Sequence, residues 1–178
     1  NYQIRRAEDI PWAVARAFYI ARSGRPGPVV LDFAKNAQTA MIEYAPQTVD
    51  FIRSYNPVPE TQPGSIEMAA ELINQSVKPL MLVGQGVELA GARQELLALC
   101  EKAQIPFGQT MLGLSAAPTG HPLNMGMLGM HGNLAPNVMT NQCDLLIAVG
   151  MRFDDRVTGD LHTYAKQAKV IHFEIDPS

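Results

Sequence analysis

The sequence predicts a doubly wound α/β fold, a parallel β-sheet covered by helices on both faces. Two continuous apolar runs, 79–83 and 145–149, each end in a glycine and have the length of a strand buried on both faces. Segments with helical spacing of apolar residues separate these runs, and such alternation is typical of parallel sheets. We therefore expect a Rossmann-like sheet whose strands end at a common edge, where ligands of such sheets bind.

Composition excludes several classes of protein. Apolar residues make up 47% and charged residues 17%, which is a globular rather than a disordered balance. The net charge of −3 gives no basic field for nucleic acid or an anionic membrane. We find no signal peptide and no apolar run long enough to cross a bilayer, so we expect a cytoplasmic protein. Cys100 and Cys143 have neither metal-ligand nor redox spacing, and we interpret them as reduced, buried thiols.

The first part of the chain predicts one helix followed by one short strand at 29–33. Asp9 is a suitable N-cap, and Ser23-Gly24 is a typical helix end. The predicted apolar stripe of this helix consists of Ile10, Val14, Ala17, Phe18 and Ala21. Such a unit is too small to hold a core alone. Because the chain opens on Asn1 without a methionine and stops at Ser178 just past a strand, we expect it to be part of a longer polypeptide.

A loss of periodicity between Asn36 and Gly64 predicts a domain boundary. Several prolines lie among polar residues there, and a stretch of this length without elements is typical of a linker. We therefore divide the chain into the edge of one domain (1–36), a linker (37–63) and a second domain (64–178).

The second domain is predicted to alternate helices and strands. Ser65 is expected to cap its first helix, whose stripe is Ile66, Ala69, Ala70 and Ile73. One further helix is predicted to carry Leu89, Ala92, Leu96, Cys100 and Ala103 inward. A second strand is expected at 105–110, a loop without period at 125–132, a helix at 134–141 and a last strand at 170–175, the last preceded by a short polar helix.

The stretch from Gly150 to Gly159 is the strongest candidate for a ligand-binding loop. It follows the buried run 145–149 and carries two arginines and two aspartates, bracketed by glycines. Charged side chains at a strand exit need either solvent or a ligand. Hydrogen bonds from Arg152 to an anion would contribute about 1.5–3 kcal/mol each.

Other candidates have both a functional and a structural interpretation. Gly84-Gln85-Gly86 either binds a phosphate or closes a tight strand–helix turn. Glu174 either accepts hydrogen bonds from a ribose or is a solvated carboxylate, and Arg25 contacts either a phosphate or flavin edge or a surface carboxylate. The methionines and glycines of 125–132 suit a flat apolar ligand. His131 has no second ligand at metal spacing, so we expect no metal site, and we recognise no catalytic triad or dyad.

Several motifs together resemble the large catalytic subunits of acetohydroxyacid synthase (acetolactate synthase), a thiamine-diphosphate enzyme family, over the whole chain. The motifs are Arg5–Asp9, Ser23–Pro28, Met127–Gly132, Arg152–Gly159 and Phe173–Asp176. Arg152–Gly159 (RFDDRVTG) is the most specific of them. The resemblance implies that 1–36 is the C-terminal edge of a pyrimidine-binding domain and 64–178 most of an FAD-binding central domain.

The resemblance also implies roles for single residues. The implied FAD contacts are Arg25, Gly86, Thr110, Met111, Leu128, Gly129, Met130, His131, Gly150, Met151, Arg152, Phe153, Asp154, Glu174 and Ile175. The implied substrate-channel residues are Lys35, Met130, Asp155 and Arg156, where Arg156 would face the carboxylate of the second 2-oxo acid. Ala34 and Ser115 depart from the proline and glycine usual in this family.

For the whole enzyme, the resemblance implies condensation of two pyruvates, or of pyruvate and 2-oxobutyrate, in branched-chain amino-acid synthesis. FAD would be bound here without net redox change, while thiamine diphosphate and Mg²⁺ would be bound outside this chain, which should be inactive alone. A homo-oligomer is expected, with a small regulatory subunit as a further partner. The alternatives are glyoxylate carboligase or another FAD-containing thiamine-diphosphate enzyme and, from another class, a stand-alone nucleotide-binding module.

Overall fold

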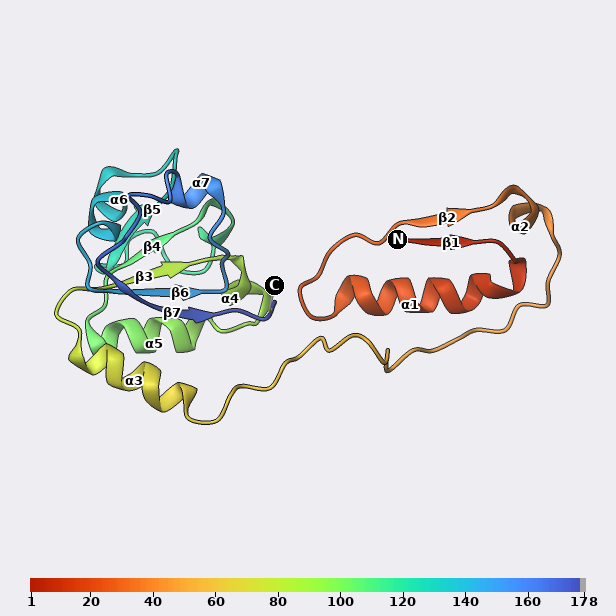
Figure 1. The fold of residues 1–178 in the computed structure, drawn as a ribbon, viewed down its shortest axis with the longest axis horizontal. Coiled ribbons are helices and arrows are strands. Elements are labelled where there is room, and N and C mark those ends of the chain that lie inside the picture. Colours follow the sequence, from red (N-terminus) through yellow and green to blue (C-terminus); the bar gives the residue numbers. More distant parts are fainter. Residues whose placement is uncertain (177–178) are drawn as a thin grey trace. The chain divides into compact units, whose positions relative to one another are not determined.

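The computed structural model describes residues 1–176, which form two compact units. The first unit contains Asn1–Glu60 together with the end of the chain from Ile175, and the second contains Thr61–Glu174. Each unit has a core of its own, and the elements of both are labelled in Figure 1.

The first unit is a small β-α-β arrangement. Strand β1 (Tyr2–Ile4) pairs in parallel with β2 (Leu31–Phe33), and the connection contains the 3₁₀ helix η1 (Ala7–Asp9) and helix α1 (Ile10–Arg22). A short helix α2 (Lys35–Thr39) follows β2. The core of this unit is built from Ile4, Ala13 and Ala37, with Ile10, Leu31 and Phe33 packed against it.

The predicted stripe of α1 is partly wrong. Ala13 is buried, whereas Phe18 is 64% exposed, because the buried face of the helix is centred on Ile10 and Ala13. Asp9 is the N-cap residue of α1, as predicted, but its side chain makes no cap hydrogen bond because η1 runs directly into α1. The predicted helix end at Ser23-Gly24 is confirmed, since Ser23 is the C-cap and Gly24 has a φ of +58°.

The second unit is a parallel sheet of five strands in the order β5-β4-β3-β6-β7. The strands are β3 (Pro79–Val83), β4 (Phe107–Gln109), β5 (Asn124–Met127), β6 (Leu145–Val149) and β7 (Lys169–Phe173). The helices are α3 (Ser65–Gln75), α4 (Gln85–Leu89), α5 (Arg93–Ala103), η2 (Met111–Gly113), α6 (Leu134–Thr140) and α7 (Asp155–Thr158). The chain order reverses between β3 and β6, which makes this the topological switch point of the sheet.

The sheet is buried on both faces, as the predicted fold class requires. Met81 and Val83 of β3 point to one face, where α3 and α5 pack, while Leu80 and Leu82 point to the opposite face. That opposite face is covered by α6 and the turns before β7 (Figure 1). The α/β prediction with a helix-covered parallel sheet is confirmed, and the apolar runs at 79–83 and 145–149 are β3 and β6.

Three predictions within this unit are wrong. The helix expected to carry Leu89 and Cys100 on one face is two helices, α4 and α5, separated at Gly91, and Leu89 is 58% exposed. The loop expected at 125–132 begins inside strand β5, which has no apolar period of its own. Ser65 is the first residue of α3 rather than its cap, and its hydroxyl donates to the Gln62 carbonyl.

Two properties of the described chain bear on the class of protein. Within residues 1–176, no helix is long and apolar enough to cross a membrane. Both cysteines are buried and unpaired, as predicted, and burial raises the pKa of Cys100 to about 12 and that of Cys143 to about 11.

Candidate functional site at the carboxyl edge of the sheet

Five loops follow the carboxyl ends of β3 to β7, and because all five strands are parallel these loops share one edge of the second unit. We call this the carboxyl edge and define it by the predicted site residues on it. They are Gly86 after β3, Thr110 and Met111 after β4, Leu128–His131 after β5, Gly150–Asp154 after β6 and Glu174 after β7. Ligands of open α/β sheets bind at such an edge.

The loops after β3 and β6 meet at the switch point in direct backbone contact. The Gly86 N–H donates to the Gly150 carbonyl at 2.9 Å, and the Gly84 N–H donates to the Val149 carbonyl at 2.9 Å. A Cβ added to Gly86 would lie 2.5 Å from the Gly150 Cα, and Gly150 has a φ of +59°. These glycines therefore serve loop-to-loop packing directly, which supports the tight-turn interpretation of Gly84-Gln85-Gly86.

The charged loop after β6 is organised around Asp154. Its carboxylate caps the short helix α7 by accepting from the Arg156 N–H at 3.1 Å. The same carboxylate lies 3.5 Å from the Arg152 Nε. The side chains of Arg152 and Arg156 are nevertheless 64% and 72% exposed. The ion pair of Arg156 with Asp155 is long, with 3.9 Å between the Arg156 Nε and a carboxylate oxygen. Both guanidinium groups thus keep most of their donors available to a ligand.

The loop after β5 reaches α7 and contacts the charged loop. The Met130 N–H donates to the Arg156 carbonyl at 2.8 Å, and the Arg156 Nη1 lies 3.9 Å from the Met130 sulfur. Leu128 is buried below this contact, while Met130 is exposed. Gly129 has a φ of +97°, and the Asn137 amide bonds both its N–H and its carbonyl at 2.9 Å. Two motifs of the resemblance, Met127–Gly132 and Arg152–Gly159, are therefore joined to each other.

The loop after β4 supplies an apolar surface. The Thr110 N–H donates to the Val83 carbonyl at 2.9 Å, and its hydroxyl accepts from the Gly113 N–H at 3.2 Å. This cap fixes η2, on which Met111 and Leu112 are exposed. An exposed methionine and leucine on a rigid turn suit contact with a flat apolar group.

The end of β7 connects back to the charged loop. His172 Nε2 lies 2.7 Å from the Met151 carbonyl oxygen and 3.9 Å from a carboxylate oxygen of Glu174. The ring of Phe153 packs edge-on against the rings of both His172 and Tyr164. Phe153 is therefore an anchor of the loop within the second core cluster, while Arg152 beside it faces solvent.

The remaining predicted site residues belong to the first unit. Arg25 follows α1, Lys35 begins α2, and Ile175 lies at the chain end grouped with that unit, all three exposed. Their membership of the same site stays a prediction. His131 is exposed on the loop after β5, and no cluster of three His, Cys, Asp or Glu residues between 1 and 176 could hold a metal ion.

Sequence reasoning missed three residues that hold the site, His172, Asn133 and Asn137. His172 is a polar residue inside an apolar strand, which is a signal in itself. Asn133 and Asn137 are four residues apart at the start of α6, so they share a face. Asn133 accepts from the Met127 N–H at 2.9 Å while Asn137 holds Gly129, and this spacing could have indicated their joint role.

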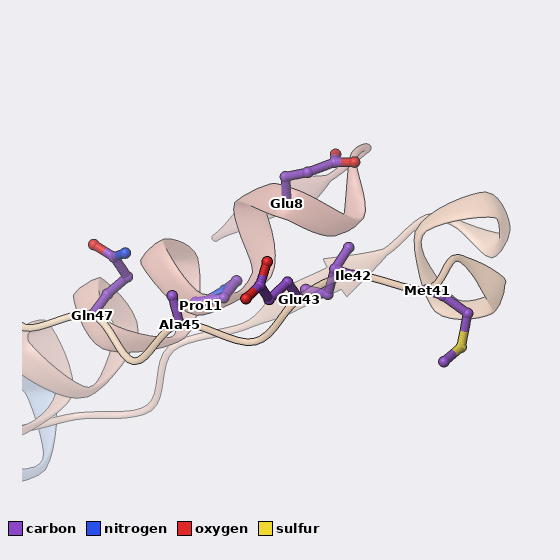
Figure 2. A pocket seen from close by; sticks show the side chains of 7 residues that line it. All are labelled: Glu8, Pro11, Met41, Ile42, Glu43, Ala45 and Gln47. Atoms are coloured by element: carbon purple, nitrogen blue, oxygen red, sulfur yellow. The ribbon is translucent and has the colours of Figure 1, made fainter.

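An open hollow of about 410 Å³ occurs in the first unit, and none of the predicted site residues lines it (Figure 2). It is lined by Glu8, Pro11, Met41, Ile42, Glu43, Ala45 and Gln47. Most of this lining comes from an extended segment without helix or strand, and Met41 is almost fully exposed. The hollow therefore lacks the rigid walls and convergent polar groups of a ligand site.

The chain is similar to curated proteins named acetolactate synthase large subunits. The acetolactate synthase large subunit of Corynebacterium glutamicum is 44% identical over 179 residues, covering 100% of this chain and 28% of that protein. The acetolactate synthase isozyme 1 large subunit of Escherichia coli K12 is 43% identical, covering 99% of this chain and 31% of that protein. The chain thus spans about a third of the length of the curated relatives it matches.

Structural comparison and a family model agree with these relatives. A solved structure described as a thiamin diphosphate-dependent enzyme from Mycobacterium smegmatis has a TM-score of 0.68 at 25% identity, covering 96% of this chain and 32% of that one. Residues 66–178 match the family model for the central domain of thiamine pyrophosphate enzymes. Since this match covers more than half of the chain, the chain belongs to the family of thiamine pyrophosphate enzyme central domains.

Proposed function

We propose that the chain is the central part of an acetolactate synthase large subunit and binds FAD at the carboxyl edge. The observation that carries the proposal is the convergence of five strand-end loops, three of which (after β3, β5 and β6) are joined by the Gly86–Gly150 and Met130–Arg156 backbone hydrogen bonds. Relatives named acetolactate synthase large subunit, at 43–44% identity over essentially the whole chain, support the choice of enzyme.

The groups on this edge suit the chemistry of FAD. A diphosphate needs cationic donors, and Arg152 offers an exposed guanidinium. Ribose hydroxyls need an acceptor, and Glu174, directly after the neighbouring strand β7, has a partly buried carboxylate. The flat ring system needs apolar contact, for which Met111 and Met130 are exposed. The remaining FAD contacts we propose are Arg25, Gly86, Thr110, Leu128, Gly129, His131, Gly150, Met151, Phe153, Asp154 and Ile175.

A second role is proposed for the other arginine. Arg156 lies against Met130 and is more exposed than Arg152, and its planar guanidinium matches a carboxylate with paired donors. We assign it to the carboxylate of the second 2-oxo acid. Lys35, Met130 and Asp155 are the other proposed residues of the substrate channel.

The activity of the whole enzyme extends beyond this chain. Pyruvate would be the first substrate, and a second pyruvate or 2-oxobutyrate the acceptor. Thiamine diphosphate and Mg²⁺, held outside this chain, would supply decarboxylation and carbon–carbon bond formation. The chain alone should therefore be inactive. We also propose a cytoplasmic homo-oligomer with a small regulatory subunit, in line with relatives named large subunits.

The other functions considered have less support. Glyoxylate carboligase, like other FAD-containing thiamine enzymes, would share the sheet, but the relatives at this identity are named acetolactate synthases. A stand-alone nucleotide-binding module would leave the first unit, with its small core, without a role. Turnover of pyruvate rather than glyoxylate by the full-length protein would distinguish acetolactate synthase from glyoxylate carboligase.

The proposal is tested by titrating FAD into the full-length protein and its variants by isothermal calorimetry. Arg152→Ala should weaken FAD binding by roughly tenfold to a hundredfold, since a charge-assisted hydrogen bond contributes about 1.5–3 kcal/mol. Lys78→Ala, which removes a positive charge at the amino end of β3, is the matched control and should bind normally. FAD affinity unchanged in Arg152→Ala would refute the assignment of this loop.

The division of labour between the arginines has its own readout. Arg156→Ala should leave FAD affinity within about threefold, because a surface charge nearby is screened by solvent. It should raise the KM for the second 2-oxo acid by an order of magnitude, as expected from loss of a paired guanidinium–carboxylate contact. Equal losses of FAD and substrate binding in both variants would contradict separate roles.

A further inference from the structure

We propose that His172 is a positioning residue, which holds the loop carrying Arg152 in place for the flavin. The inference rests on the proposed FAD function of the carboxyl edge and deepens it. It names a side chain that would not itself touch the cofactor. The imidazole acts through the backbone of Met151.

The contact is specific in geometry. His172 pairs with Ala148 in the parallel register of β6 and β7, on the sheet face that also carries Leu82 and Leu146. From there its Nε2 reaches the Met151 carbonyl oxygen at 2.7 Å. At the ends of the two strands, the Gly150 N–H donates to the Phe173 carbonyl at 2.9 Å. His172 therefore extends the connection one residue beyond the sheet, to the point where the charged loop begins.

The hydrogen bond fixes the protonation of one ring nitrogen. A carbonyl oxygen can only accept, so Nε2 must carry the proton and donate it. The Glu174 carboxylate, 3.9 Å from the same Nε2, favours that orientation of the ring. Phe153 covers the ring with a centroid distance of 5.3 Å. The imidazole, whose side chain is 35% exposed, is thus oriented by Glu174 and Phe153 and in turn holds Met151.

The consequence falls on Arg152. Met151 is buried, and the next residue projects its guanidinium into solvent. The direction of that projection depends on where the Met151 peptide is fixed. Without the His172 bond, the Met151 carbonyl loses its partner, and the two following residues gain conformational freedom. A guanidinium that must be ordered on binding gives a weaker complex than one already in place.

His121, next to the outer strand β5 on the other side of the sheet from β7, offers a matched control. His121 precedes β5 and is likewise held between a carboxylate and the backbone, with Nε2 3.1 Å from Glu101 and Nδ1 accepting from the Leu123 N–H at 3.2 Å. It contacts Phe107 much as His172 contacts Phe153. Replacing His121 removes a comparable structural histidine without touching the carboxyl edge.

The experiment compares His172→Leu, His172→Gln and His121→Leu in the full-length protein, with two readouts. FAD affinity should fall roughly threefold to tenfold in His172→Leu, as expected from loss of one hydrogen bond, and stay at the wild-type value in His121→Leu. The glutamine amide can also donate to the Met151 carbonyl, so His172→Gln should recover affinity to within about twofold. Amide hydrogen exchange without FAD should accelerate at 150–154 in His172→Leu only.

The outcomes separate this inference from the proposed function. If the wild type binds FAD but His172→Leu has unchanged affinity and unchanged exchange at 150–154, the positioning role is refuted while the FAD site stands. If His172→Gln behaves like His172→Leu, the donated hydrogen bond is not the cause, and the inference also fails. If the wild type binds no FAD, the proposed function fails and the inference with it, whatever the exchange rates are.

Discussion

Replacing Gly150 by alanine should destabilise the second unit more than the same replacement at Gly86 or Gly91. Two effects combine at this position. Its φ of +59° is unfavourable for an L-residue by about 1–2 kcal/mol. The added Cβ would also lie 2.6 Å from the Gly86 Cα and 2.7 Å from the Val87 N. Such overpacking costs about 1–3 kcal/mol, so the expected loss is about 2–5 kcal/mol.

Two further variants isolate the two effects. In Gly86→Ala, the Cβ would meet the Gly150 Cα at 2.5 Å, but no positive φ is involved. In Gly91→Ala, the φ is +66° but nothing lies within 4 Å of the added Cβ. Gly86→Ala should therefore show the packing cost alone, and Gly91→Ala the backbone cost alone. Gly150→Ala should exceed both.

The assay is urea denaturation of this chain followed by far-UV circular dichroism, with fluorescence of its single tryptophan as an internal reference. Trp12 lies in the first unit, so its transition should not respond directly to changes at the switch point. A free energy of unfolding for Gly150→Ala no lower than that for Gly91→Ala would refute the close packing of the two loops. It would also remove the structural explanation for these glycines.

Four further predictions concern single side chains. The Tyr164 hydroxyl is buried without a hydrogen-bond partner among residues 1–176, so Tyr164→Phe should be neutral or raise the free energy of unfolding by up to about 1 kcal/mol. The Tyr55 hydroxyl donates to a backbone carbonyl at 2.8 Å, so Tyr55→Phe should lower the free energy of unfolding by about 1 kcal/mol. Equal losses of stability in Tyr164→Phe and Tyr55→Phe would contradict the absence of a hydrogen bond at Tyr164. Asp144 accepts from a serine hydroxyl and two backbone N–H groups, and these bonds lower the pKa of its carboxyl. Its ionised form therefore stabilises the fold above the unfolded pKa of about 4 and ceases to do so as pH falls, so the destabilisation by Asp144→Asn should be larger at pH 7 than at pH 3 in urea titrations. A pH-independent difference would contradict that. Because burial raises the pKa values of Cys100 and Cys143 to about 12 and about 11, neither thiol should react with iodoacetamide at pH 8 until the protein unfolds, and rapid labelling of the native protein would show that a thiol is accessible.

The strands at the centre of the sheet could be predicted from sequence because their signal is local. Residues 79–83 and 145–149 are buried on both faces, and a continuous apolar run records this without any knowledge of neighbours. Strand β5 has no such apolar run. Gly126 interrupts it, and the strand is held from outside, with the Asn133 side chain accepting from Met127 and Asn124 donating to the buried Gln109. These side-chain contacts join residues 6 and 15 apart, and an apolar pattern does not report them.

The candidate site was predictable in position but not in its connections. Because Arg152 follows a buried parallel strand, its place at the carboxyl edge follows from topology alone. The bond from Met130 to the Arg156 carbonyl joins residues 26 apart, and the bond from His172 to Met151 joins residues 21 apart. Spacing along the chain predicts neither. The predicted apolar helix faces were wrong at Phe18 and Leu89, which have helical spacing but face solvent. Spacing along the chain does not report which side of a helix packs against the rest of the protein.

The most direct test of the central claim is hydrogen exchange of the full-length protein with and without FAD. If the strand-end loops jointly bind the flavin nucleotide, FAD should slow exchange at 84–86, 110–113, 128–131, 150–154 and 174. Residues 104–106 and 120–123, at the amino ends of β4 and β5, should not change. Protection confined to one loop, or located at those amino ends instead, would contradict a shared site at the carboxyl edge.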